Sequence, residues 1–229
     1  MTKVAYIPAR GGSKRIPQKN IRAFNGVPAL GRVIDVIAST GLFDKIVVST
    51  DSQLIRDVAT LHSASVIDRS TETSGDLTGL LDVVRGDGEL IDQIGGDVEL
   101  LACILPTALL MDPADLATAV KMVIDGLASF VISVGRFRYP IHRALEINEQ
   151  FQIAMVSPEN YLVRSQDLPE RHHDAGQFYV GTREAWNERH TMFDQPSTAI
   201  VIDDWRVQDI DVEADWTRAE KLWRVLESE

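Results

Sequence analysis

Short apolar runs alternate with amphipathic segments along almost the whole chain. Runs such as L-L-A-C-I-L are apolar at successive positions, which is typical of strands buried on both faces between helix layers. The alternation of such strands with helices predicts an α/β fold with a mainly parallel sheet. The strands are expected at residues 4–7, 45–49, 65–67, 100–105, 130–134, 177–180 and 198–202.

Cap and turn residues divide the amphipathic segments into helices. Pro28 is expected to open a helix that stops at Gly41. Asp112 and Pro113 provide an N-cap and a first turn for a helix that ends near Gly126. Further helices are expected after Thr50 and Asp51, after Thr182, over residues 77–94 and over residues 215–226.

Residues 136–170 interrupt this alternation. The segment contains three prolines and two short extended candidates, at 144–148 and 151–156. We interpret it as an excursion from the core sheet that serves as a lid or a subunit contact. No repeat and no low-complexity linker divides the chain, so residues 1–229 are expected to form a single domain.

The composition indicates a soluble globular protein. The formal net charge of −11 argues against nucleic-acid or membrane-surface binding, which would need a broadly positive face. The N-terminus lacks the pattern of a signal peptide, and no run of about 18 apolar residues occurs. Cys103 lies in an apolar run, where a buried structural thiol is expected. We therefore expect a cytoplasmic protein without disulfides.

The positive charges are concentrated near the N-terminus. Residues 1–34 hold seven Lys and Arg and no Asp or Glu, so this segment carries +7. The remainder has 16 basic and 34 acidic residues, which gives −18. Five of the 23 basic residues fall within residues 10–22. This contrast predicts a small anionic partner.

The basic segment follows the first expected strand, at the edge where open α/β sheets bind ligands. Gly11 and Gly12 allow the backbone N–H groups to converge on phosphate oxygens. Charged donors can come from Arg10, Lys14 and Lys19, and a hydroxyl from Ser13. The spacing is neither that of a Walker loop nor that of G-x-G-x-x-G. The alternative is a tight turn with solvated charges.

Asp209 and Asp211 flank an apolar residue near the end of the chain. In an extended segment this alternation puts both carboxylates on one face. Two neighbouring carboxylates repel each other unless a cation lies between them, and Mg²⁺ suits such an oxygen pair. The alternative is a solvated strand edge that leads into the last helix.

Polar and aromatic residues are dense over residues 164–179. The adjacent histidines at 172 and 173 lack further ligands at zinc-binding spacing, so we interpret the region as the wall of an anion or polyol pocket, or as a surface loop. No G-x-S-x-G motif occurs, and no nucleophile is paired with a base in the sequence. A covalent mechanism is therefore not supported.

Four motifs resemble those of the nonulosonate cytidylyltransferases, which activate sialic acid and its relatives with CTP. They are I-P-A-R-G-G-S-K-x-x-x-x-K-N at 7–20, L-P-T at 105–107, R-S-Q-D-L-P at 164–169 and D-I-D-V-E-A-D-W at 209–216. Within the family, the motifs R-F-R-Y-P-I-H-R-A-L at 136–145 and H-D-A-G-Q-F-Y at 173–179 are most similar to the pseudaminic acid branch. The resemblance covers essentially the whole chain.

The resemblance implies a Rossmann-like nucleotidyltransferase fold and a homodimer, with residues 136–170 as the dimerisation segment. It implies CTP binding by Arg10, Gly11, Gly12, Ser13, Lys14, Lys19, Asn20 and Arg69, with Arg69 on the cytosine side. It further implies Mg²⁺ binding by Asp209 and Asp211, sugar binding by Arg164, Gln166, Gln177 and Tyr179, and catalytic roles for Arg10, Lys19 and Asp211.

The implied reaction is the Mg²⁺-dependent transfer of CMP from CTP to the anomeric hydroxyl of a nine-carbon 2-keto sugar acid. Leu105, where sialic acid enzymes have Gln, and residues 108–110, where they have S-P-L, favour pseudaminic acid over ordinary sialic acid. The alternatives are a sialic or legionaminic acid enzyme, a sugar-1-phosphate nucleotidyltransferase and a non-catalytic nucleotide-binding protein.

Overall fold

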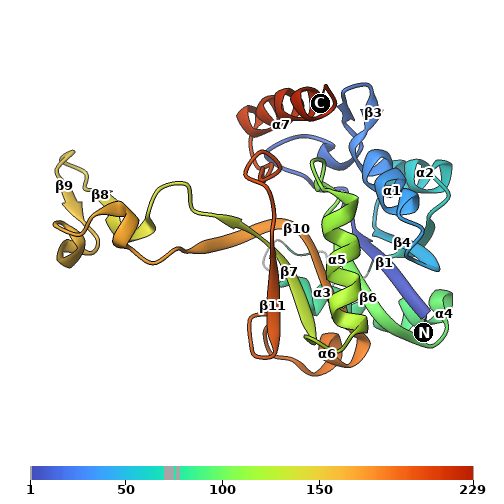
Figure 1. Ribbon diagram of the computed structural model, residues 1–229. Helices are drawn as coiled ribbons and strands as arrows, with labels where there is room; N and C mark the ends of the chain where they lie inside the picture. Colours follow the sequence, from blue (N-terminus) through green and yellow to red (C-terminus); the bar gives the residue numbers. More distant parts are fainter. Residues whose placement is uncertain (1, 70–74, 76–77, 229) are drawn as a thin grey trace.

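The computed structural model describes residues 2–69, 75 and 78–228. Over these residues, seven strands form one sheet in the order β11-β7-β10-β6-β1-β4-β5 (Figure 1). β10 runs antiparallel to both of its neighbours, whereas the other neighbouring strands run parallel. The strands are β1 (Thr2–Pro8), β4 (Lys45–Thr50), β5 (Ser65–Asp68), β6 (Val98–Ile104), β7 (Phe130–Arg136), β10 (His172–Thr182) and β11 (Ser197–Val201). The predicted, mainly parallel sheet is confirmed.

Helices cover both faces of the sheet. One face packs against α1 (Ala29–Ser39), α2 (Gln53–Leu61), α5 (Pro113–Ile124) and α7 (Glu213–Leu226), and the other against α3 (Leu80–Gly86), α4 (Gly88–Gly95) and α6 (Arg183–Glu188). In β1, Ala5 and Ile7 enter the first core and Val4 and Tyr6 enter the second, so the strand is buried on both faces. This burial explains why the strand is apolar at successive positions.

The cap residues behave as the sequence predicts. Asp112 accepts a hydrogen bond from the backbone N–H of Ala114 at 2.8 Å, and Thr182 accepts one from that of Ala185 at 3.1 Å. Cys103 is fully buried. None of the described helices combines the length and the apolarity needed to cross a membrane.

The helical segment expected over 77–94 is present as two helices, α3 and α4, which meet at Asp87. This carboxylate is fully buried and accepts hydrogen bonds from the hydroxyl of Tyr6, at 2.6 Å, and from that of Ser49. The next residue, Gly88, packs closely against the side chain of Arg183. A Cβ atom at position 88 would lie 2.7 Å from Nη2 of Arg183. The predicted start at residue 77 lies outside the described residues.

β10 begins five residues before the predicted strand. Its first residues, His172, His173 and Asp174, are polar but pair with β7. A register shift follows, at which Gly176 adopts a φ of 64°. The polar start conceals this part of the strand in the sequence, because the apolar pattern begins only after the shift.

An arm of residues 137–171 connects β7 to β10 and projects away from the sheet (Figure 1). Its elements are the 3₁₀ turns η2 (Ile141–Arg143), η3 (Pro158–Asn160) and η4 (Ser165–Asp167) and the antiparallel strands β8 (Leu145–Ile147) and β9 (Ile153–Met155). The two short extended segments predicted in the excursion are therefore confirmed. Many apolar side chains of the arm are exposed.

The last helix packs against the beginning of the chain (Figure 1). After the turn η1 (Lys19–Ile21), a hairpin of β2 (Ala23–Phe24) and β3 (Val27–Pro28) lies beside α7. The rings of Phe24 and Trp216 meet edge to face, with centroids 5.6 Å apart. Arg22 donates to both carboxylate oxygens of Glu213 at 2.6 Å. These contacts bring the first loop and the segment before α7 to the same edge of the sheet.

Candidate active site

The chain changes direction across the sheet at β1. It moves from β1 to β4 and β5 on one side and returns to β6 on the other. Open α/β sheets bind ligands at the carboxyl ends of strands at such a switch point. A cavity of about 350 Å³ lies here, with Pro8 at the end of β1 and Leu105 directly after β6 in its wall. We call it the first cavity.

The loop after β1 folds back against the start of α2. The backbone N–H of Gly11 donates to Oδ1 of Asp51 at 2.7 Å, and Nδ2 of Asn20 donates to the carbonyl of Arg10 at 3.0 Å. A Cβ atom at Gly11 would lie 2.9 Å from Cβ of Ser52, so this close approach requires glycine. The backbone at the base of the loop is thus held in place by hydrogen bonds to the side chains of Asp51 and Asn20.

Most residues predicted to bind a nucleotide line the first cavity. They are Arg10, Ser13, Lys14, Lys19, Asn20 and Arg69. Gly11 and Gly12 lie in the exposed turn beside it. Arg15 adds another cation, and among the described residues of the wall Asp211 supplies the single carboxylate. This surplus of positive charge suits a polyanion.

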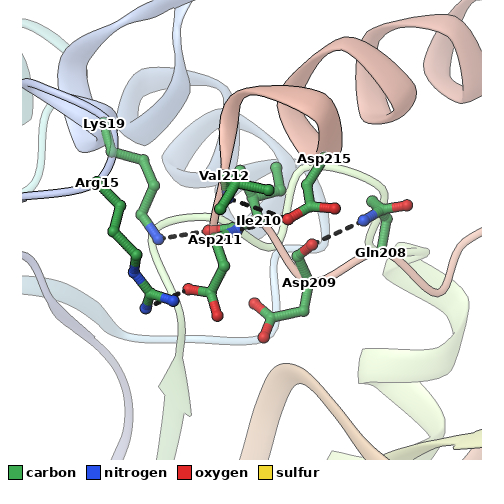
Figure 2. Close-up of polar contacts among 8 residues, drawn as sticks. All are labelled: Arg15, Lys19, Gln208, Asp209, Ile210, Asp211, Val212 and Asp215. Atoms are coloured by element: carbon green, nitrogen blue, oxygen red, sulfur yellow. Dashed lines mark hydrogen bonds and ion pairs between the residues drawn. The ribbon is translucent and has the colours of Figure 1, made fainter. Parts of the chain in front are cut away.

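The acidic segment lies between the core and the first cavity. Ile210 is only 1% exposed and packs into the core, which turns the carboxylates of Asp209 and Asp211 to the other side (Figure 2). Residues 207–211 belong to no strand, so the alternative of a strand edge is wrong, whereas the two carboxylates lie on one side as predicted. Asp215 accepts hydrogen bonds from the backbone N–H groups of Asp211 and Val212, at 3.1 and 3.0 Å.

Two cations of the first loop reach this segment (Figure 2). Nζ of Lys19 donates to the carbonyl of Ile210 at 2.6 Å. Nη2 of Arg15 lies 2.7 Å from Oδ1 of Asp211. The basic loop and the acidic segment, far apart in the sequence, therefore form one site.

Burial and neighbouring charges shift two pKa values in this site. Desolvation lowers the pKa of Lys19, although Asp211 and Asp209 oppose the shift. Desolvation raises the pKa of Asp209, and the charge of Asp211 raises it further, against the opposing charge of Lys19. Because the native state holds this proton more tightly than the unfolded chain, the stabilising contribution of protonated Asp209 is lost as the pH rises through its raised pKa.

The two carboxylates fit a divalent cation that takes its other ligands from water and a substrate. Among the described residues, no group of three or more His, Cys, Asp or Glu side chains could hold a metal ion by itself. Mg²⁺ is commonly bound by one or two carboxylates together with substrate phosphates. Asp211 already attracts the cation of Arg15, whereas burial and the neighbouring charge of Asp211 raise the pKa of Asp209 by disfavouring its charged form.

A second cavity of about 890 Å³ adjoins the acidic segment. Asp211 lines both cavities, and Asp209 lines the second. Arg136 and His173, at the arm ends of β7 and β10, contribute to its wall, together with Arg138. A ligand in the second cavity can therefore approach a ligand in the first across these carboxylates.

Two of the residues predicted to bind a sugar, Arg164 and Gln166, lie on the arm. Nε of Arg164 donates to Oδ2 of Asp167 at 2.7 Å. Gln166 lines a small cavity at the root of the arm together with Arg136 and Arg138, which also line the second cavity. Their contact with a sugar stays a prediction.

The other two, Gln177 and Tyr179, are buried in β10. Nε2 of Gln177 donates to the carbonyl of Arg206 at 2.7 Å, while its Oε1 is buried without a hydrogen-bond partner among the described residues. The hydroxyl of Tyr179 donates to Oδ2 of Asp174 at 2.7 Å, and burial raises the pKa of this hydroxyl. Sugar binding by these residues also stays a prediction.

The sequence interpretation missed Arg15 and Arg138 as site residues. Arg15 is part of the basic segment, but nothing in its spacing distinguishes it from a solvated neighbour of Lys14. Arg138 lies where the chain leaves β7, and only the fold places it near the acidic segment. The surplus of basic residues over 10–22 was the available signal for the first of them.

Comparisons with known proteins agree with this geometry. A family model described as cytidylyltransferase matches residues 4–106. The pseudaminic acid cytidylyltransferase of Campylobacter jejuni is 36% identical over 226 residues, which cover 98% of this chain and 97% of that protein. The chain belongs to the cytidylyltransferase family. This membership confirms the resemblance drawn from the motifs.

This cytidylyltransferase is also similar to a vertebrate protein and to a solved structure. The N-acylneuraminate cytidylyltransferase B of Danio rerio is 33% identical over 230 residues, covering 98% of this chain and 51% of the fish protein. The fold is also similar to a solved structure of CMP:2-keto-3-deoxy-manno-octonic acid synthetase in complex with CTP, with a TM-score of 0.70 and 15% sequence identity. The match covers 99% of this chain and 100% of that chain. The structural likeness confirms the predicted Rossmann-like nucleotidyltransferase fold.

Replacing Asp211 by Asn should lower the pKa of the Asp209 carboxyl, because the substitution removes a neighbouring negative charge. Replacing Lys19 by Met should raise it, because the substitution removes a neighbouring positive charge. The carbon-13 chemical shift of the Asp209 carboxyl, followed against pH, measures both changes.

Asp125→Asn provides the matched control, since Asp125 pairs with Lys121 on α5, away from this site. That variant should leave the Asp209 titration unchanged. If both site variants also left it unchanged, neighbouring charges would not set the pKa of Asp209.

Proposed function

We propose that this cytidylyltransferase transfers CMP from CTP to the anomeric hydroxyl of a nonulosonic acid, with pseudaminic acid as the first candidate, and releases pyrophosphate. One observation carries the proposal: a cation-rich cavity at the switch point of the sheet adjoins the Asp209–Asp211 pair. The full-length similarity to a pseudaminic acid cytidylyltransferase supports the choice of sugar. CTP and a buried, unpaired cysteine suit a reaction in the cytoplasm.

The first cavity is the proposed nucleotide site. Arg10, Lys14 and Lys19 would bind the triphosphate, with the Ser13 hydroxyl and the backbone N–H of Gly12 as further donors, whereas the N–H of Gly11 already donates to Asp51. Each charge-assisted contact contributes on the order of 1.5–3 kcal/mol. Arg69, which also lines this cavity, would bind on the cytosine side. These donors would fix the α-phosphate near the acidic segment.

Asp209 and Asp211 would hold Mg²⁺. An ion held by these two carboxylates would supply positive charge to offset the negative charge on a leaving pyrophosphate. The role of the protein is then chiefly to position the reactants for in-line attack and to neutralise charge. Lys19 contributes to both, because its bond to the carbonyl of Ile210 holds the triphosphate loop beside the two carboxylates.

The second cavity is the proposed site of the sugar acid. A 2-keto sugar acid carries a carboxylate, which requires a cationic partner. Arg138 is suited to this role, because its Nη2 donates only to the carbonyl of Asp204, at 2.7 Å, and has no carboxylate partner among the described residues. A sugar bound here would face the α-phosphate across Asp211.

The reaction is tested by incubating the purified protein with CTP, Mg²⁺ and, in turn, pseudaminic, legionaminic and N-acetylneuraminic acid. We expect pyrophosphate release and a CMP-sugar, with the highest kcat/KM for pseudaminic acid. Asp211→Asn should lower kcat by about a hundredfold, because charge stabilisation in the transition state is lost. Chromatography of the CMP-sugar and a pyrophosphate assay provide the measurement.

Asp125→Asn, remote from the site, should retain full activity. If the protein bound CTP but formed no CMP-sugar with any acid of the panel, the proposed reaction would be contradicted. The protein would then be a non-catalytic nucleotide-binding protein. A higher kcat/KM for N-acetylneuraminic or legionaminic acid would retain the reaction but change the sugar. The similarity to the fish N-acylneuraminate enzyme is the reason to include these acids.

Replacing Arg138 by Met should raise the KM for the sugar acid about tenfold or more and leave the KM for CTP unchanged, because one charge-assisted contact to the carboxylate is lost. Steady-state kinetics with each substrate varied in turn measure the two constants. Arg171→Met is the matched control, since Arg171 lies at the arm root but does not line the second cavity. Equal effects of both variants would place the sugar carboxylate elsewhere.

The arm is the proposed contact with a second copy of the chain. Its strands β8 and β9 expose Leu145, Ile147 and Ile153, and Tyr161 and Leu162 are exposed nearby. A projecting hairpin with this much exposed apolar surface is more typical of an interface than of a solvated loop. The proposed oligomer is therefore a homodimer.

A variant with Leu145→Asp and Ile147→Asp should be monomeric, because two charges would be buried in the proposed interface. Light scattering after size exclusion should give 25.4 kDa for the variant and twice that mass for the unmodified protein. Leu61→Asp is the control, since Leu61 is an exposed leucine on α2 and should leave the mass unchanged. A monomeric unmodified protein would contradict the dimer.

A further inference from the structure

Arg15 pairs with one of the two carboxylates assigned to the metal. Its Nη2 lies 2.7 Å from Oδ1 of Asp211, and Figure 2 shows the guanidinium beside the carboxylate. The Arg15 side chain is 66% exposed and that of Asp211 is 42% exposed. A solvent-exposed pair of this kind is weak, so a competing partner can replace it.

The neighbouring residues limit what has to move. Ile16, directly after Arg15, is 1% exposed and anchors the loop in the core. Lys19 is tied to the neutral carbonyl of Ile210, not to a carboxylate. Only the guanidinium of Arg15 has to rotate to leave Asp211, while Lys19 keeps the loop beside the acidic segment.

Arg15 and Asp211 both line the first cavity, which is also the proposed site of the triphosphate. Arg15 lines the first cavity together with Arg10, Ser13 and Lys14, which are assigned to the triphosphate. A triphosphate there carries several negative charges and bidentate acceptor oxygens, whereas Asp211 offers a single carboxylate. A divalent ion at Asp211 would in turn repel the guanidinium.

We infer that Arg15 is a further nucleotide-binding residue that pairs with Asp211 while the site is empty and transfers to the triphosphate when CTP and the divalent ion bind. This inference rests on the proposed function. The same side chain then opposes the ion in the absence of CTP and supports CTP binding. Binding of the ion and binding of the nucleotide are coupled through Arg15, and the coupling must be reciprocal.

The first measurement is the binding of Mn²⁺ without nucleotide, followed by electron paramagnetic resonance. Mn²⁺ shares the preference of Mg²⁺ for oxygen ligands. Arg15→Ala should tighten Mn²⁺ binding about two- to fivefold, since it removes the cation that competes for Asp211. Arg15→Lys, which keeps the charge, should tighten it less.

The second measurement is the binding of CTP in the presence of a chelator, followed by calorimetry. Arg15→Ala should weaken CTP binding about tenfold. Asp211→Asn should tighten it, because Arg15 is released and a repelling charge is removed. In the double variant, Arg15→Ala with Asp211→Asn, the increase in CTP affinity that comes from the release of Arg15 should be absent. The changes in the free energy of CTP binding caused by the two substitutions should therefore not be additive.

Lys121→Ala is the matched control, because Nζ of Lys121 pairs with Asp125 at 2.6 Å on α5 in a similarly exposed pair. It should change neither constant. Unchanged Mn²⁺ and CTP binding in Arg15→Ala, or additive effects in the double variant, would overturn the exchange. If the unmodified protein bound no CTP, the proposed function would fail, whereas the Mn²⁺ comparison would still decide whether Arg15 competes for Asp211.

Discussion

The site depends on the contact between the first loop and the segment before the last helix. Lys19 donates to the carbonyl of Ile210, which lies 191 residues later in the chain. The Arg22–Glu213 pair and the contact of Phe24 with Trp216 hold the same two segments together. Without this junction, the basic first loop would form an anion site alone, and Asp209 and Asp211 would lie apart from it in a surface loop. Together they form the site that is proposed to bind a triphosphate and a divalent ion.

The sheet and most helices could be predicted from the sequence, because burial on both faces leaves successive apolar positions in strands such as β1. Two features escaped for physical reasons. β10 begins with polar residues whose strand pairing depends on β7. The break at Asp87 depends on hydrogen bonds to side chains of two distant strands, which the spacing within a helix cannot reveal.

The same limit applies to the site. The basic loop was recognisable because its charge contrasts with an acidic chain and because glycines follow a strand. The second cavity was recognisable only in part: the pocket wall predicted over residues 164–179 includes His173, whereas Arg136 and Arg138 meet the acidic segment only after β7 and β10 pair. Arg15 was visible as a charge, but its proximity to Asp211 is a property of the folded chain. The sequence shows which residue types are available, whereas the topology of the fold determines which of them come into contact.

The arm differs from the sheet in how freely its sequence can change. All three residues of β8 are exposed, whereas four residues of β1 are fully buried. Substitutions at exposed positions usually change the free energy of unfolding by less than about 0.5 kcal/mol, whereas core substitutions commonly cost several times more. Substitutions on the surface of the arm can therefore accumulate with little effect on the stability of the sheet that bears the first cavity. The same fold can in this way carry arms with different surfaces.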